Sequence, residues 1–303
     1  MNPVYAKYFA DPFVFRAGAD YFAIGTGPDE AGGSNRRTVF PMLRSRDLRE
    51  WTEAGSALVR PDVEGDTFWA PEIACSNGAF FLYYSVGTAD RGHQLRVAEA
   101  SSPEGPYHDR AALTEVEDVP FAIDPHPFRD DDGRWYLFHA RDFTGTTDGR
   151  AGTALVVSEL ETMTQLARHV TTVMRAHFDW QLFAKNRSMY GRTYDWYTLE
   201  GPFVVKREGR YFCLYSGGCW QNDTYGVDYG VAESVLGPWD DRGGENGPRI
   251  LRTIPGRVIG PGHCSVIDDM LVYHAWDTSM GARTMRIDPL RFTSDGPRCE
   301  GPT

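Results

Sequence analysis

Three carboxylates stand just before short apolar segments at widely separated points of the chain. They are Asp11 in Ala-Asp-Pro-Phe, Asp124 in Ile-Asp-Pro-His-Pro-Phe and Glu200 in Leu-Glu-Gly-Pro-Phe. Cleaving an acetal needs an acid that protonates the leaving oxygen, and a carboxylate that either activates water or attacks directly. The three acids therefore predict glycoside hydrolysis, with two groups that exchange protons and a third that orients or tunes one of them.

Glu200 is the best candidate for the acid. Its neighbours in the sequence are apolar, and desolvation disfavours the charged form of a carboxyl and raises its pKa. Asp11 and Asp124, taken singly, could be turn residues before a proline. It is the context shared by all three that favours a function.

Five pairs of short aromatic and β-branched segments, separated by polar turns, must position these acids. Such pairs predict β-hairpins, and no segment shows helical periodicity for more than two turns. The paired segments are 12–15 with 21–24, 72–74 with 79–84, 127–128 with 135–138, 202–205 with 211–215, and 263–267 with 270–274.

A polar residue leads each hairpin, and the five leading residues recur at intervals of about 60 residues, enough for one four-stranded propeller blade. The sequence therefore predicts an all-β, five-bladed β-propeller, with residues 1–303 as one catalytic domain. A two-sheet sandwich is the alternative, but it gives no reason for the repeat. The first strand of each blade lines the axis, which directs the leading residues there: Asp11, Glu72, Asp124, Glu200 and His263.

Composition excludes several classes of function. The 42 acidic residues outnumber the 31 basic ones and give a net charge of −11, which disfavours nucleic acid as a partner. The longest apolar runs are far shorter than the roughly 20 residues that cross a bilayer, so no membrane partner is expected. The first residues lack the features of a secretion signal, which favours a cytoplasmic location.

The five cysteines are odd in number and lack Cys-x-x-Cys spacing. They predict five reduced thiols, without a disulfide framework or a zinc knuckle. Cys75 and Cys213 lie in apolar runs, so we expect both to be buried.

Several linked motifs, in order, resemble glycoside hydrolase family 43, the five-bladed propeller enzymes that act on arabinan and xylan. The resemblance runs from about Tyr8 to Pro297. The motifs that carry it are Phe-Ala-Asp11-Pro-Phe, Thr-Phe-Trp69-Ala-Pro-Glu72, Ile-Asp124-Pro-His-Pro-Phe, Leu-Glu200-Gly-Pro-Phe and Gly-Pro-Gly-His263.

The resemblance implies an inverting mechanism with Asp11 as general base, Asp124 as the residue that tunes and orients the acid, and Glu200 as general acid. We expect an α-L-arabinofuranosidase that removes terminal pentoses from oligosaccharides. A β-xylosidase and an endo-1,5-α-L-arabinanase are alternatives, and segments 141–152 and 178–196 should decide between them. A non-catalytic sugar-binding propeller would lack one proton carrier, and all three are present.

The resemblance also implies substrate contacts and a metal. Trp69 is expected to pack against a sugar ring, with Phe9 and Phe68 as weaker candidates, and Arg283 to reach a sugar hydroxyl or a catalytic carboxylate. His263 is expected near an axial metal, usually calcium with a largely water-filled shell. One histidine alone is a poor calcium site, because hard cations prefer oxygen ligands. No organic cofactor is expected. Glu72 is expected to serve structure or the pocket wall.

Overall fold

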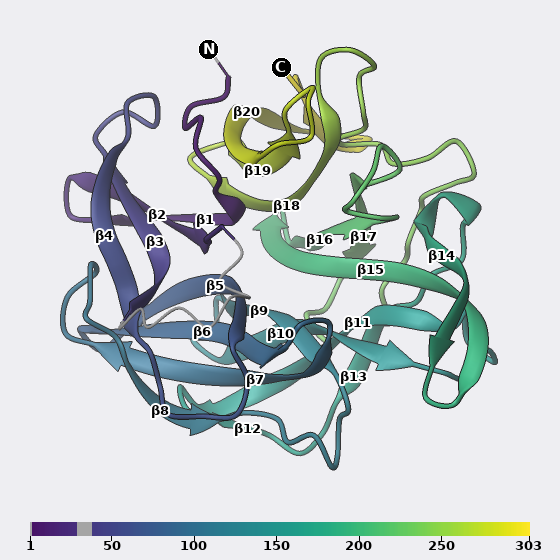
Figure 1. Cartoon of the computed structure of the whole chain (residues 1–303), viewed down its shortest axis with the longest axis horizontal. Coiled ribbons are helices and arrows are strands. Elements are labelled where there is room, and N and C mark those ends of the chain that lie inside the picture. Colours follow the sequence, from purple (N-terminus) through teal and green to yellow (C-terminus); the bar gives the residue numbers. More distant parts are fainter. Residues whose placement is uncertain (1, 29–37) are drawn as a thin grey trace.

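The computed structural model describes residues 2–28 and 38–303. Its strands form twisted antiparallel sheets that follow one another around a central axis in chain order, from purple to yellow (Figure 1). The chain is a five-bladed β-propeller, as predicted.

In the described residues the blades contain three to five strands each. Blade I contains β1 (Ala10–Ala17), β2 (Asp20–Thr26), β3 (Thr38–Ser45) and β4 (Thr52–Val59). Blade II contains β5 (Thr67–Ser76), β6 (Ala79–Thr88), β7 (Arg91–Ala100) and β8 (His108–Ala112). Blade III contains β9 (Ala122–Arg129), β10 (Trp135–Phe143), β11 (Gly152–Thr162), β12 (Gln165–Leu166) and β13 (Thr171–Met174). Blade IV contains β15 (Arg192–Arg207), β16 (Arg210–Gly217) and β17 (Gly226–Ala232). Blade V contains β18 (Ile259–Ile267), β19 (Met270–Trp276), β20 (Arg283–Thr293) and β21 (Gly296–Cys299).

Blades III and IV are joined into one nine-stranded sheet. A short 3₁₀ helix, η1 (Asp179–Gln181), leads into β14 (Leu182–Met189), which pairs with the first half of β15. That half of β15 also runs parallel to the start of β11, with Gly152 opposite Tyr197. Gly152 adopts a φ of 152°, and a Cβ there would collide with the backbone of Tyr197, so the junction requires glycine.

The five predicted hairpins are confirmed. The pairs β1–β2, β5–β6, β9–β10, β15–β16 and β18–β19 are all antiparallel, and in each blade the first strand is the innermost.

Each inner strand is interrupted by a β-bulge near its start, where the pairing register shifts. At every bulge one residue has a positive φ between 47° and 59°: Asp11, Ala70, Asp124, Gly201 and His263. A bulge bends the strand and re-aims a side chain, and three of these five residues, Asp11, Asp124 and His263, are candidate site residues. The expected equivalence of Glu72 and Glu200 with Asp11 is therefore corrected. Glu72 lies two residues after its bulge residue, and Glu200 lies one before.

The residues two positions after the bulges form a second axial layer, which consists of Phe13, Glu72, His126, Phe203 and Ser265. Phe203 packs on Phe13 and on His126, with ring centroids 6.4 Å and 4.4 Å apart. The Ser265 hydroxyl donates to the carbonyl of Pro12 on the neighbouring blade. All five residues of this layer are buried.

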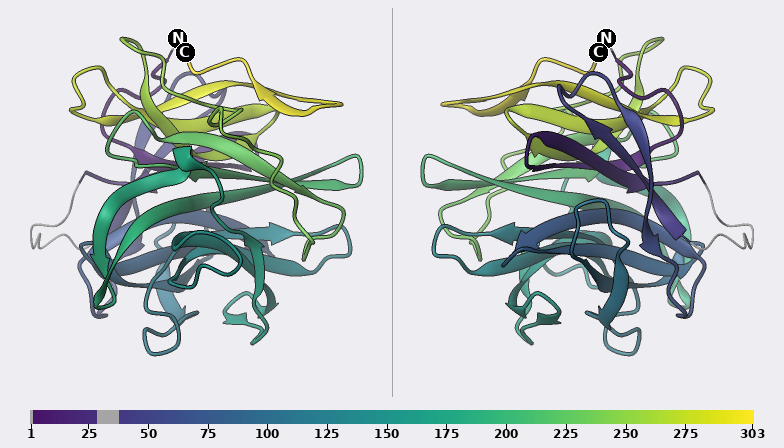
Figure 2. Two further views of the ribbon diagram at one scale, coloured as in Figure 1. Left: turned by 90° about the vertical axis from the view of Figure 1, so that its right-hand side faces the viewer. Right: turned by 90° about the vertical axis from the view of Figure 1, so that its left-hand side faces the viewer.

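The ring is closed by the N-terminal segment. Val4 and Tyr5 donate backbone hydrogen bonds to Met285 of β20, and the Asn2 amide donates to Thr303. Both termini consequently lie together at blade V (Figure 2).

The cysteine predictions are confirmed in part. All five cysteines are free, and Cys213 is buried. Cys75 is exposed, so the expectation that it is buried is wrong; it lies near the outer end of β5, beyond the packed part of the strand. Within residues 2–28 and 38–303, no helix is long and apolar enough to span a bilayer.

Candidate active site

Asp11, at the bulge of β1, is surrounded by polar and charged side chains from four other strands, β2, β18, β19 and β20. Thr26 at the end of β2 donates its hydroxyl to Asp11 Oδ2 at 2.6 Å. Asp11 Oδ1 lies 3.5 Å from the Arg283 guanidinium, 3.4 Å from His263 Nδ1 and 3.3 Å from His274 Nδ1. The structure therefore brings three of the residues singled out in the sequence together: Asp11, His263 and Arg283.

These neighbours keep Asp11 ionised. Burial alone would raise the pKa of Asp11, but the charge that His263 gains on protonation and the permanent charge of Arg283 hold that pKa far below its usual range. An Asp carboxylate in this state is available to accept a proton at any working pH.

His274 on β19 was missed by sequence reasoning. The backbone N–H of Asp11 donates to His274 Nδ1 at 3.0 Å, so the ring proton must be on Nε2. Burial lowers the pKa of His274 to about 4 and keeps the ring neutral. A single histidine on a second strand carries no motif that could have marked it.

Asp124 and Glu200 form the opposite side of the site. Asp124 Oδ2 accepts the backbone N–H of Gly201 at 2.9 Å, which ties the bulge of β9 to the strand that carries Glu200. Glu200 Oε1 accepts the hydroxyl of Tyr225 at 2.6 Å and leaves Oε2 to hold a proton. Tyr225, just before β17, was also missed, because it belongs to none of the five motifs.

The pKa values of Asp124 and Glu200 are both raised. Burial raises the pKa of Glu200 to about 7; the Tyr225 hydrogen bond opposes the shift, and the charge of Asp11 adds to it. Burial and the charges of Glu200 and Asp11 also raise the pKa of Asp124 well above its ordinary value. Two buried carboxyls whose charges repel each other cannot both ionise at low cost, so they titrate as a pair that retains one proton near neutral pH.

His263 lies between the two sides. Its Nδ1 is 3.4 Å from Asp11 Oδ1 and 4.0 Å from Asp124 Oδ2, and its backbone N–H donates to Ser216 Oγ. In the described part of the chain, no group of three or more His, Cys, Asp or Glu side chains could hold a metal ion. One imidazole nitrogen without a cage of oxygen ligands does not fit calcium, so the metal expectation rests on the resemblance alone and no step below uses a metal.

Arg283 is held by aromatic rings as well as by Asp11. Its guanidinium lies over Trp220, Tyr8 and Trp276, 4.5, 5.4 and 5.8 Å from the ring centroids, and it donates to the Tyr8 hydroxyl. Trp220 and Trp276 stack on each other and keep part of their surface exposed. These rings fix the cation beside Asp11 and also form an aromatic border to the site.

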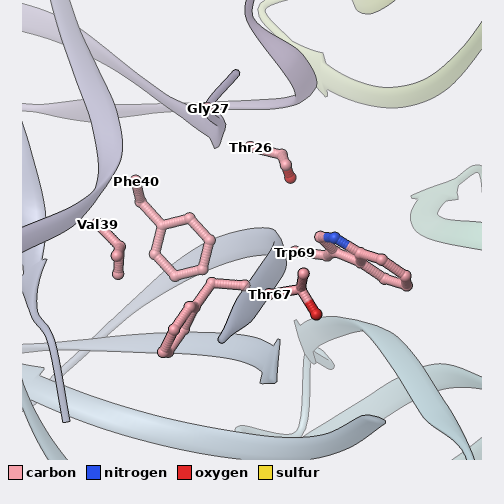
Figure 3. A pocket seen from close by; sticks show the side chains of 7 residues that line it. Thr26, Gly27, Val39, Phe40, Thr67 and Trp69 are labelled. Atoms are coloured by element: carbon pink, nitrogen blue, oxygen red, sulfur yellow. The ribbon is translucent and has the colours of Figure 1, made fainter. Parts of the chain in front are cut away.

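Trp69, which was expected to contact a sugar, lies on β5 with its indole stacked on His93 at 3.7 Å. It is partly exposed, and its neighbour Ala70 donates a backbone hydrogen bond to Thr26, the residue that holds Asp11. Burial lowers the pKa of His93 to about 4, so a neutral ring supports the indole. Figure 3 shows Trp69 and Thr26 close together.

Phe9 and Phe68 do not present a face to a substrate, which corrects both expectations. Phe9 is 0% exposed and packs in the core with Val14 and Leu43. Phe68 is buried against Phe40, and the cavity it lines beside Trp69 has a volume of about 20 Å³, enough for one water molecule but not for a sugar (Figure 3). Both residues stand beside a motif, which predicts a place in the pocket, but packing between blades buries them.

The hairpin formed by β14 and β15 borders the Glu200 side. Arg187 of β14 forms an ion pair with Asp90 in the turn between β6 and β7, at 3.0 Å, and its charge lowers the pKa of Glu200 slightly against the larger effect of burial. Tyr190 at the tip donates to Asp142 of β10. Both contacts involve the segments expected to decide specificity, 141–152 and 178–196.

A buried, ionised carboxylate and a carboxyl pair that retains a proton, brought together at the axis of a propeller, are suited to acetal hydrolysis. Residues 1–297 match the family described as glycosyl hydrolases family 43. The chain belongs to this family and is a glycosidase.

Similar proteins agree with this assignment. The chain is 29% identical over 320 residues to the β-D-galactofuranosidase xynD of Aspergillus niger, covering 97% of this chain and 83% of that protein. It is 26% identical over 308 residues to the extracellular endo-α-(1→5)-L-arabinanase 1 of Bacillus subtilis, covering 95% and 86%. The crystal structure of a thermostable family-43 glycoside hydrolase superposes with a TM-score of 0.82 at 28% identity, covering 100% of this chain and 96% of that one.

Proposed function

We propose that this glycosidase is an inverting, exo-acting α-L-arabinofuranosidase that releases terminal pentoses from arabinan- or xylan-derived oligosaccharides. The observation that supports the mechanism is that the carboxyls on the two sides of the site differ in protonation state. Asp11 is held ionised by cations, whereas the pKa of Glu200 is raised to about 7. Carboxyls whose environments move their pKa values apart divide into a base and an acid.

In the proposed reaction, Asp11 removes a proton from a water molecule as its oxygen attacks the anomeric carbon. Glu200 donates its proton to the glycosidic oxygen on the opposite face, and the bond between that oxygen and the anomeric carbon breaks. The sugar is released with inverted configuration, and a proton then returns from Asp11 to Glu200 through solvent. Asp124 holds the backbone beside the acid and keeps the shared proton on the pair.

The preference for a five-membered sugar ring is supported by the two named relatives. One is a galactofuranosidase by name. The other acts by name on 1,5-linked arabinose, whose linked O5 cannot also be the ring oxygen of a pyranose, so those residues are furanosyl.

Exo action is supported by the hairpin of β14 and β15. The Arg187–Asp90 ion pair and the Tyr190–Asp142 hydrogen bond fasten it to blades II and III beside Glu200. A hairpin fastened in this way would close one side of the site and suit the removal of terminal residues, whereas an endo-arabinanase needs a groove open at both ends.

The test compares chromogenic α-L-arabinofuranoside, β-D-galactofuranoside and β-D-xylopyranoside, and follows the first-formed sugar from an arabino-oligosaccharide by NMR. We expect the highest kcat/KM on the arabinofuranoside, single arabinose units as the first products, and inverted configuration. A faster xylopyranoside, longer first products, or retained configuration would each refute the corresponding part of the proposal.

A further inference from the structure

A second carboxylate–imidazole pair lies in the axial layer directly beneath the site. Glu72 of β5 and His126 of β9 are both buried, and Glu72 Oε2 lies 2.7 Å from His126 Nδ1. His126 follows Asp124 by two residues, so the pair sits one layer below the carboxyls that share a proton. No step of the proposed reaction uses it.

The contacts of His126 determine its tautomer. Its Nε2 accepts the backbone N–H of Val204 at 3.0 Å and must therefore carry a lone pair. The ring proton is then on Nδ1 and is donated to Glu72. Both ring nitrogens are satisfied only when His126 is neutral and Glu72 can accept.

Val204 belongs to the strand that carries Glu200 and lies just beyond the point where the regular pairing of that strand is interrupted. Between Glu200 and Phe203 the register of β15 with β16 shifts, and Pro202 has no N–H to donate. On the axial side of β15, Gly201 N–H is bound by Asp124 and Val204 N–H by His126. Two side chains of β9 thus clamp the bulge of β15 directly after Glu200.

We propose that Glu72 and His126 are positioning residues for Glu200: Glu72 fixes the tautomer of His126, and His126 with Asp124 clamps the bulge of β15 that aims the acid. The inference rests on the proposed acid role of Glu200. The pair acts through the backbone of β15 and does not contact substrate.

Glu72 also contributes its charge to the carboxyl pair. Asp124 is faced by Glu200 from β15, Asp11 from β1, Glu72 from β5 and His263 from β18, and the charge of Glu72 is one of those that raise the pKa of Asp124. Removing that charge lets the Asp124–Glu200 pair lose its shared proton more easily. The alkaline limb of the pH–rate profile should therefore move to lower pH.

The experiment compares Glu72→Gln, His126→Gln and the double variant on two aryl arabinofuranosides, one with a good and one with a poor leaving group. We expect kcat on the poor leaving group to fall about 10-fold or more in each single variant, with KM little changed, as is usual when a supporting partner is lost. The two residues act through one path of hydrogen bonds. The kcat of the double variant should therefore be no lower than that of the less active single variant. Glu72→Gln alone should also lower the alkaline limb.

Asp228→Asn is the matched control. Asp228 on β17 is a fully buried carboxylate paired with Arg249, away from the axis, and its loss should lower the melting temperature while leaving kcat and the pH profile unchanged. Melting curves for all variants separate lost folding from lost positioning.

Three outcomes would overturn the inference: kinetics of Glu72→Gln that match Asp228→Asn, losses that are independent of the leaving group, or losses that add in the double variant. Imidazole ¹⁵N NMR of His126 in the wild-type protein gives a readout that does not depend on activity. An Nδ1–H neutral ring at neutral pH is expected, and an Nε2–H or doubly protonated ring contradicts it. If Glu200→Gln itself keeps wild-type activity, the proposed function fails, whereas the NMR result still decides the tautomer.

Discussion

The two sides of the site differ in charge although their backbones are alike. Asp11 and Asp124 occupy equivalent bulges, each with a positive φ and each followed by proline. Asp11 faces Arg283 and two imidazoles, whereas Asp124 faces Glu200 and, one layer below, Glu72. The inner-strand motif therefore places a carboxyl at the axis, and residues from neighbouring strands and blades decide whether it is ionised.

Neutralising one acid on each side of the site should have the largest effect on catalysis. Asp11→Asn and Glu200→Gln are nearly isosteric, and each should reduce kcat about 10²–10⁴-fold on a substrate with a poor leaving group. An activated leaving group needs little protonation, so it should restore much of the rate in Glu200→Gln and little in Asp11→Asn. Equal recovery in both variants, or near-wild-type turnover in either, would contradict the division of roles.

Arg283→Gln removes the permanent cation from the Asp11 side. The pKa of Asp11 should rise toward its ordinary value, so that the base is protonated, and the rate lost, as the pH falls through the acidic range. We expect about a 10²-fold loss of kcat/KM at neutral pH, comparable with the loss of one positioned charge-stabilising donor. The measurement is the acidic limb, which should appear in Arg283→Gln and not in the wild type; an unchanged acidic range would show that Arg283 does not set the charge state of Asp11.

Asp124→Asn removes a negative charge from the opposite side. The last proton of the pair then belongs to Glu200 alone and is lost at lower pH, so the alkaline limb should move downward. We expect about a 10–100-fold loss, larger for poor leaving groups, because the anchor of Gly201 is also weakened. If Asp124→Asn moved the acidic limb and left the alkaline one in place, Asp124 would belong with the base.

Tyr225→Phe should have the smallest effect on the rate. It should move the alkaline limb in the direction opposite to that expected for Asp124→Asn. The Tyr225 hydroxyl stabilises the ionised form of Glu200, so its removal raises the pKa of Glu200 further and moves the alkaline limb upward by about one pH unit. The rate at pH 6 should change by less than about 10-fold, since Glu200 is already protonated there. A downward shift would show that the hydroxyl stabilises the protonated acid instead.

The sequence predicted the residues that share a motif and missed those that do not. The five hairpins followed from alternating aromatic and turn residues, and the acids Asp11, Asp124 and Glu200 were found because each precedes an apolar strand. His274, Tyr225 and the Trp220–Trp276 pair lie on second strands or loops, where their types and spacing carry no repeat. Their roles arise from contacts between residues far apart in the chain.

The pairing register of the inner strands also could not be predicted from the sequence. The repeat aligns Asp11 with the polar residues Glu72 and Glu200, whereas the bulges align it with Ala70 and Gly201. A single extra residue at a bulge changes which side chain meets the axis, and no local pattern reports it. For this reason Glu72 lies one layer beneath the acids and not, as the repeat predicts, beside them.

The most direct test is the pH dependence of kcat/KM for the wild-type enzyme on an aryl arabinofuranoside. Glu200 must be protonated to act and its pKa is raised to about 7, so the rate should fall as the pH rises through that value. Asp11, whose pKa is held far below its usual range, should give no fall between about pH 6 and pH 5. A rate that instead fell on acidification through this range and stayed constant up to pH 9 would contradict the assignment of Asp11 as the ionised base and Glu200 as the protonated acid.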